Sequence, residues 1–305
     1  MRAQLNLVAL TAAAPMVWGT TYVVTTELLP TDAPLWSAAL RALPAGLLAV
    51  VIGRRIPRDG WWWRAAALGT LNIGAFFALL FVAAYRLPGG VAATLGATGP
   101  LVTSAYALIL LGQRSTRWRL AWGVAGVVGV AMMVLRPDAA LDPVGLVAGL
   151  AGVLAMSAGV VLTQRWGQPV GALPFVGWQL TAGGLVLLPI ALALEGAPPS
   201  IDAPAVGGYL WLGLVGTLAA YALWFRGIGR LSVVSVSFLG LLSPAVATTI
   251  GWLVLDQSLT AVQLLGFALA LASTAAGQLR TGRRPKHSRP DVVPAPAPVA
   301  SASCS

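Results

Sequence analysis

The chain has 305 residues, of which 58% are apolar and only 9% are charged, whereas soluble domains carry about 25% charged residues. So little charge cannot cover the apolar surface of a soluble fold of this length, and the composition excludes an ordinary soluble domain. One cysteine, Cys304, and one histidine, His287, exclude a disulfide framework and a zinc finger. We therefore expect no bound metal and no cofactor.

Ten stretches are apolar over about 20 residues, the length that a membrane-spanning helix needs. They are expected at residues 5–25, 35–52, 65–85, 91–111, 118–135, 144–164, 173–194, 205–225, 233–255 and 262–279. The pattern predicts an all-α integral membrane protein with ten transmembrane helices. A cleaved signal peptide is the alternative for the first stretch, because residues 12–14 are all Ala, but the apolar run continues through Trp18.

The arginines predict the orientation. With the N-terminus placed inside, 16 of the 19 lysines and arginines fall in inner segments, while Arg86 and Arg136 lie outside and Arg41 lies within a span. The positive-inside rule then places both termini in the cytoplasm, in the cell membrane. It also explains the net charge of +10 without nucleic acid as a partner, since the inner arginines face anionic lipid head groups. Residues 280–305, basic and then rich in Pro, Ala and Ser, are expected to be a disordered cytoplasmic tail, with a regulatory or partner-binding motif as the alternative.

The two halves of the chain match each other. An offset of 144 places Pro100 on Pro244, and an offset of 138 places Gly46 on Gly184 and Arg41 on Gln179. Each half, 5–135 and 144–279, holds five expected helices, an odd number, so the halves cross the membrane in opposite senses. Transporters built from such inverted repeats bind substrate where the repeats meet. Chance alignment of apolar sequence is the alternative.

These features resemble the EamA-type transporters of the drug/metabolite transporter superfamily, over residues 5 to about 279. Four groups of residues carry the resemblance: Trp18-Gly19, Pro34 with Arg41, residues 95–101 (LGATGPL) and residues 239–245 (LGLLSPA). It implies export or exchange of amino acids and related small metabolites, through a central cavity lined by helices one to four and six to nine. A Gly-Glu-Arg-like end to the fourth and ninth helices is common in that family. Here those sites read Gly112-Gln113-Arg114 and Asp256-Gln257-Ser258, so no role is carried over to them.

Arg41 is the first candidate for substrate binding, because a charge inside hydrocarbon is costly and is usually functional. A guanidinium suits a substrate carboxylate. The alternative is structural: the side chain extends to the interface, or bonds backbone carbonyls near Pro44.

Polar and aromatic side chains are expected to complete the cavity, since such walls suit a small amphipathic solute. Asn72 and Phe76 share a helix face, as do Thr217 and Tyr221. The full set of candidates besides Arg41 is Trp18, Tyr22, Asn72, Phe76, Thr98, Trp178, Gln179, Thr217 and Tyr221. Interfacial anchoring and helix packing are the alternatives for each. Pro100 and Pro244 are expected to kink gating helices in mid-span, or to be packing kinks.

Other classes of function fit less well. An intramembrane enzyme needs a nucleophile with a base, or metal ligands, and the spans offer no His, Cys, Asp or Glu for that purpose. A membrane scaffold subunit is a second rival. Among transporters, a multidrug exporter of amphipathic compounds is the runner-up to a metabolite exporter. We expect a non-enzymatic transporter of a small-molecule solute that works as a monomer or homodimer in the bilayer.

Overall fold

The computed structural model describes residues 2–30, 33–87, 89–135, 142–254 and 259–279, and within them every regular element is helical. Ten helices are long and apolar enough to cross a membrane. The expected all-α membrane fold with ten spans is therefore confirmed. The expected tail, residues 280–305, and the Asp256-Gln257-Ser258 site lie outside the described residues.

Five spans are single helices of 18 to 24 residues: α3 (Pro34–Gly53), α8 (Arg117–Val134), α9 (Pro143–Trp166), α10 (Ala172–Glu195) and α15 (Ala261–Gln278). The first span is divided at Gly19 into α1 (Arg2–Trp18) and α2 (Thr21–Leu28). Gly19 is needed there because a Cβ would lie 2.7 Å from the Ser243 carbonyl oxygen of the ninth span. The break therefore forms where the two spans cross closely.

The fourth and ninth spans are each interrupted near their proline. The fourth consists of α6 (Gly89–Ala97) and α7 (Gly99–Leu111), and the ninth of α13 (Val233–Leu239) and α14 (Leu242–Val254). Pro100 and Pro244 thus lie in the first turn of a new helix, where a missing N–H is tolerated. The expected mid-helix kink is corrected to a break between two helices, at repeat-matched positions.

The third and eighth spans each contain a π-helical segment. The third runs through α4 (Trp61–Gly69), η1 (Thr70–Gly74) and α5 (Ala75–Arg86), and the eighth through α11 (Ala203–Leu210), η2 (Trp211–Ala219) and α12 (Ala220–Ile228). A π turn inserts an extra residue and shifts the side chains that follow it around the helix. The shared face expected for Asn72 and Phe76 assumes a regular α-helix, whereas Asn72 lies within η1.

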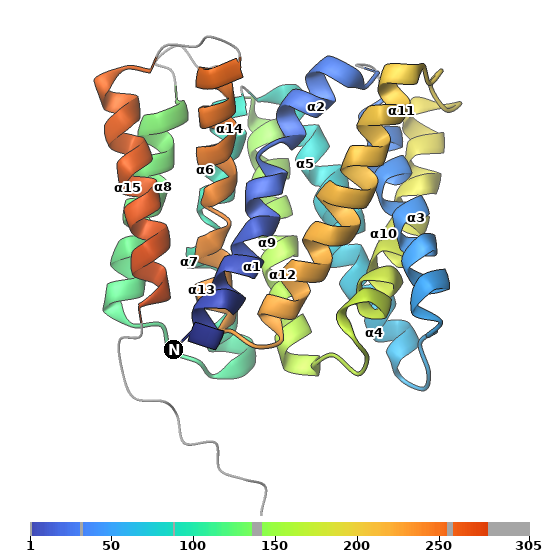
Figure 1. The fold of residues 1–305 in the computed structure, drawn as a ribbon, viewed down its shortest axis with the longest axis horizontal. Coiled ribbons are helices and arrows are strands. Elements are labelled where there is room, and N and C mark those ends of the chain that lie inside the picture. The colour runs from blue at the N-terminus through green and yellow to red at the C-terminus, as the bar shows by residue number, and fades with distance from the viewer. Residues whose placement is uncertain (1, 31–32, 88, 136–141, 255–258, 280–305) are drawn as a thin grey trace, which may run out of the picture.

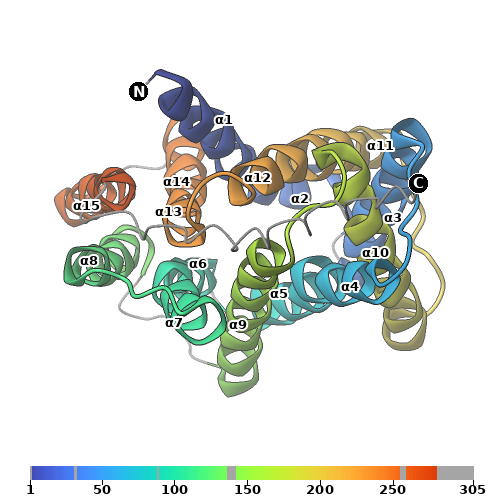
Figure 2. The same cartoon turned by 90° about the horizontal axis from the view of Figure 1, so that it is seen from below.

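The helices form an elongated bundle, with one helix pair at each extremity of its long axis (Figures 1 and 2). The α3–α10 pair lies at one end and the α8–α15 pair at the other, so the second and fifth helices of each half pack against their counterparts. Glycines allow the α3–α10 contact, because a Cβ on Gly46 would lie 2.5 Å from the Thr181 nitrogen and one on Gly184 would lie 2.7 Å from the Leu43 Cβ.

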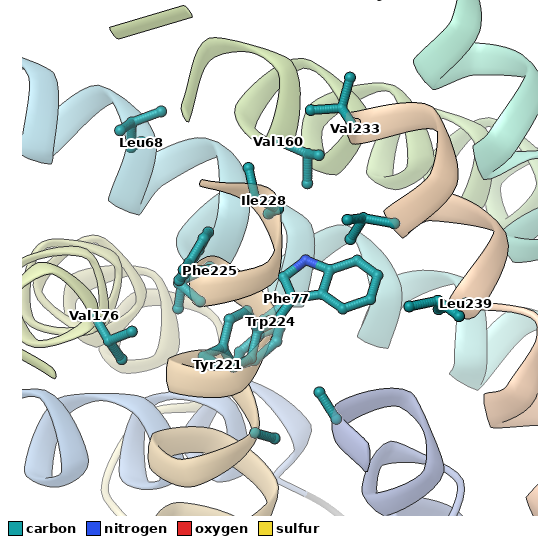
Figure 3. Packing of buried hydrophobic residues seen from close by; sticks show 14 of the residues in the cluster. Leu68, Phe77, Val160, Val176, Tyr221, Trp224, Phe225, Ile228, Val233 and Leu239 are labelled. Carbon is teal, nitrogen blue, oxygen red and sulfur yellow. The ribbon is translucent and has the colours of Figure 1, made fainter. Parts of the chain in front are cut away.

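Charge separates the two ends of the helices. The end that holds the N-terminus in Figure 1 carries the basic connections, and we call it the basic end: Arg54, Arg55, Arg58, Arg114, Arg165, Arg226 and Arg230. The opposite, acidic end carries Asp142, Glu195 and Asp202 at helix termini, and there Arg86 pairs with Asp142 at 3.6 Å. The buried core between the ends is dominated by aromatic and aliphatic side chains (Figure 3).

Candidate functional site

Arg41 lies two turns into α3 and is only 5% exposed. Its Nε donates a hydrogen bond of 3.0 Å to the Thr217 hydroxyl, and its Nη2 donates one of 3.5 Å to the Gly216 carbonyl oxygen. Its Cζ lies 4.7 Å from the centre of the Phe77 ring, in a cation–π contact. The side chain is therefore held in the interior, and extension to the interface is excluded as its explanation.

The π-helical segment η2 supplies Arg41 with its polar partners. Both Gly216 and Thr217 belong to η2, where the wider turn departs from the α-helical bonding pattern. The Gly216 carbonyl accepts a second hydrogen bond, from the Trp18 indole at 3.0 Å. One carbonyl of the second half thus binds two side chains of the first half.

Aromatic rings surround this polar centre. Trp18 lies 5.1 Å from Tyr221 and 5.1 Å from Trp224, measured between ring centroids, and Phe77 lies 6.4 Å from Tyr221. Figure 3 shows Tyr221, Trp224 and Phe225 projecting from α12 into the bundle. The Trp224 Nε1 is buried without a hydrogen-bond partner in the described chain.

A second polar pair lies in the interior, between η1 and α10. The Asn72 Nδ2 donates a 2.7 Å hydrogen bond to the Gln179 Oε1, and neither residue is exposed. The Asn72 Oδ1 and the Gln179 Nε2 find no partner among the described residues. Gly159 on α9 makes room for Asn72, since a Cβ there would overlap its Oδ1. A free acceptor and a free donor are therefore buried side by side.

The structure brings four of the predicted residues together: Trp18, Arg41, Thr217 and Tyr221. Gln179, the repeat partner of Arg41, instead joins Asn72. Trp178 lies toward the basic end, where its indole donates a 2.7 Å hydrogen bond to the Arg55 carbonyl.

The remaining predicted residues make more local contacts. The Thr98 hydroxyl bonds the Leu95 carbonyl of its own span at 2.6 Å, and the ring of Phe76 lies 5.7 Å from that of Phe77. The side chain of Tyr22 lies outside the described residues.

Three members of the site were not anticipated from the sequence: Phe77, Gly216 and Trp224. A phenylalanine in an apolar span carries no signal that separates a cation–π partner from a core residue. The sequence likewise does not indicate which glycine carbonyl accepts a hydrogen bond from a side chain. Trp224 is three residues from Tyr221, and residues three or four apart share a helix face. This spacing, which also pairs Thr217 with Tyr221, was the one available indication that Trp224 belongs to the site.

No carboxylate among the described residues forms an ion pair with Arg41. A buried guanidinium normally binds such a group, and its planar fork suits a carboxylate or phosphate with two parallel bonds. The described chain also holds no cluster of His, Cys, Asp or Glu suited to a metal ion. The guanidinium and the aromatic rings are the kinds of groups that suit an anion and an apolar group, respectively.

Two cavities lie at opposite ends of the helices. One of about 270 Å³ at the acidic end is lined by residues that include Pro34, Phe81 and Glu195. Another of about 700 Å³ lies at the basic end, among α1, α12 and α13. Arg41 is buried between these ends.

Comparison with known sequences gives the family. A model of the EamA-like transporter family matches residues 6–135 and 143–276. The Protein PecM of Dickeya dadantii is 47% identical over 255 residues, which cover 83% of this chain and 86% of that protein. A probable amino-acid metabolite efflux pump of Salmonella typhimurium is 26% identical, over 84% of this chain and 89% of that protein.

A solved crystal structure shares the fold, with a TM-score of 0.75 over 90% of this chain and 96% of the other at 18% identity. The family matches span nearly all of the described helices, and the relatives are proteins of similar length. The chain is therefore a multi-pass membrane protein that belongs to the EamA-like transporter family, whose work is the membrane transport of metabolites.

Proposed function

We propose that this protein exports or exchanges a small amphipathic metabolite, an amino acid or a related compound, and that Arg41 binds its carboxylate. The observation that carries the proposal is the buried Arg41, which bonds the second half of the chain but has no acidic partner among the described residues. A charge at this depth is costly, and a carboxylate substrate would offset that cost.

The surroundings of Arg41 fit the rest of an amino acid. Trp18, Phe77 and Tyr221 provide an aromatic wall for an apolar side chain. The free Asn72 and Gln179 atoms offer an acceptor and a donor for the substrate's polar groups. The name of the Salmonella relative, a probable amino-acid metabolite efflux pump, agrees with this substrate class.

Alternating access is the mechanism that the architecture favours. The broken fourth and ninth spans and the π turns η1 and η2 lie in helices of both halves, and breaks of this kind are typical hinge and binding positions in transporters. Rocking of one half against the other would open the Arg41 site in turn toward the cavity at each end. Thr217 and Gly216 would then release or re-form their bonds with Arg41 during the cycle.

The first test identifies the solute. Metabolites in the medium of cells with and without the gene are compared, and enriched carboxylates are then assayed in liposomes that contain the purified protein. Arg41→Gln should lower transport of the identified solute about tenfold or more, since a charge-assisted bond is lost. Arg41→Lys should recover only part of it, because lysine lacks the planar fork.

The controls separate binding from folding. Arg165→Gln removes an exposed arginine at the basic end and should transport normally. Thr217→Val keeps the shape of its side chain but removes the partner of the Arg41 Nε, so it tests the site without removing the charge. Normal transport of a carboxylate solute by well-folded Arg41→Gln would refute the assignment.

A further inference from the structure

A cavity of about 700 Å³ lies away from Arg41 at the basic end. Its walls come from the start of α1, the end of α12, the start of α13, and one residue each of α8 and α15. The lining residues that matter here are Gln4, Arg119, Arg226, Arg230, Ser235 and Gln278. They place the cavity at the basic ends of these helices.

Three arginines converge on this cavity from two different helices and a connection. Arg119 comes from α8, Arg226 from the last turn of α12, and Arg230 from the connection to α13. Among the described residues that line the cavity there is no aspartate or glutamate. Like charges around one cavity repel, so the arrangement favours an anion between them.

Arg119 is held in place by neighbouring side chains. Its Nη2 donates a 2.9 Å hydrogen bond to the Ser235 hydroxyl, which also receives a bond of 2.9 Å from Ser232. The Gln278 amide donates to the Ser235 carbonyl at 2.8 Å, so α8, α13 and α15 are joined at this point. The Arg119 Nε is nevertheless buried with no partner in the described chain. Arg119 therefore lines the cavity with one donor engaged and another without a partner among the described residues.

We propose that this cavity is an anion-binding site for a phosphate or carboxylate group, held by Arg119, Arg226 and Arg230. Arginines that serve only to orient the chain in the membrane need only be exposed in the connections. Arg119, by contrast, is bonded to Ser235 and lines a cavity together with two other arginines. The proposal does not depend on what Arg41 binds. The anion has two possible sources, the head group of an anionic phospholipid or a free anionic solute, and both present the same chemistry.

The test uses purified full-length protein and two probes that present a phosphate group from the two sources. Phosphatidylglycerol in nanodiscs, against phosphatidylcholine alone, presents the lipid head group, and glycerol 3-phosphate presents the free anion. Native mass spectrometry counts bound lipid, and intrinsic tryptophan fluorescence follows the melting temperature with each probe. The variant is Arg226→Gln with Arg230→Gln, because both side chains are exposed. Arg114→Gln with Arg165→Gln is the matched control, with the same loss of charge at the same end but outside the cavity.

We expect at least one probe to bind and to raise the melting temperature, with affinity that falls as salt rises. The Arg226/Arg230 variant should weaken that binding about tenfold or more, from roughly fivefold per arginine, while the Arg114/Arg165 control stays near wild type. Binding of phosphatidylglycerol alone assigns the lipid, and binding of glycerol 3-phosphate assigns the free anion. Arg119→Gln should act in the same direction, and if it fails to fold the double variant decides. No binding of either probe, or equal loss in variant and control, would overturn the proposal.

Discussion

The carboxylate of Glu195 accepts a hydrogen bond of 2.9 Å from the backbone N–H of Trp36, across the interface between the two halves. Its other oxygen accepts one of 2.8 Å from the Leu35 N–H. Glu195 ends α10, whereas Leu35 and Trp36 lie in the first turn of α3, whose N–H groups have no partner within the helix. A residue of the second half therefore caps a helix of the first half, and its negative charge stabilises the positive end of the helix dipole.

This cap leads to a prediction about stability. Glu195→Ala removes both hydrogen bonds and should lower the free energy of unfolding by about 2 kcal/mol, as expected for bonds to a charged group. Glu195→Gln keeps one oxygen acceptor without the charge and should lose less. Thermal unfolding in detergent measures both variants. If Glu195→Ala melts like the wild type, the cross-half cap has no energetic role.

The α3–α10 contact gives a second prediction. Gly184→Ala would place a Cβ 2.7 Å from the Leu43 Cβ and 3.0 Å from the Leu43 nitrogen, and backbone cannot move aside cheaply. We expect a loss of about 1–3 kcal/mol in stability, as for overpacked cores, and a similar loss for Gly46→Ala. Gly207→Ala is the control, because nothing lies within 4 Å of its Cβ position. Equal melting temperatures in all three variants would mean that the helices are less closely packed than described.

The sequence was sufficient for the ten spans because hydropathy and helix length decide them. It also singled out Arg41, since a charge in a span is conspicuous. It could not show that Arg41 bonds Thr217, because the two are 176 positions apart and only tertiary packing brings them together. The repeat suggested instead a correspondence of Arg41 with Gln179, which bonds Asn72.

Local backbone departures were the least predictable part of the fold. Pro100 and Pro244 indicated an irregularity in two spans, but the choice between a kink and a break depends on the helices around them. The π segments have no residue signature of their own, and here they accompany close contacts such as that of Gly159 with Asn72. Trp178 resembled a cavity residue by type, whereas its partner, the Arg55 carbonyl, is fixed by the turn that follows α3.

Orientation in the membrane gives a third prediction, because the arginine distribution predicts that the basic end faces the cytoplasm. In a Cys304→Ser background, which lacks other cysteines, Gln113→Cys places a thiol in an exposed connection at the basic end and Ser200→Cys places one at the acidic end. A membrane-impermeant thiol reagent added to intact cells should label Ser200→Cys and spare Gln113→Cys. Permeabilised cells should label both. The reverse pattern would invert the orientation.

The last prediction concerns the source of energy. Proton-coupled transporters generally use a titratable Asp, Glu or His inside the membrane, and the sequence places none within a span except Glu195, the final residue of α10. Glu195 is already engaged with the start of α3 at the acidic end, and Arg41 does not release its proton at usable pH. Sodium is the remaining ion to test, because interrupted helices expose backbone carbonyls that bind it.

We therefore expect a facilitator or exchanger that follows the gradient of its own substrate. Liposomes loaded with unlabelled solute should take up labelled solute by counterflow with no ion gradient imposed. Replacing sodium with choline on both sides should leave the initial rate unchanged, and an imposed pH gradient should produce no accumulation above equilibrium. Protein-free liposomes and the Arg41→Gln variant provide the background. Uphill accumulation driven by the pH gradient, and retained in Glu195→Gln, would mean that a coupling group other than Glu195 operates and that the facilitator mechanism is wrong.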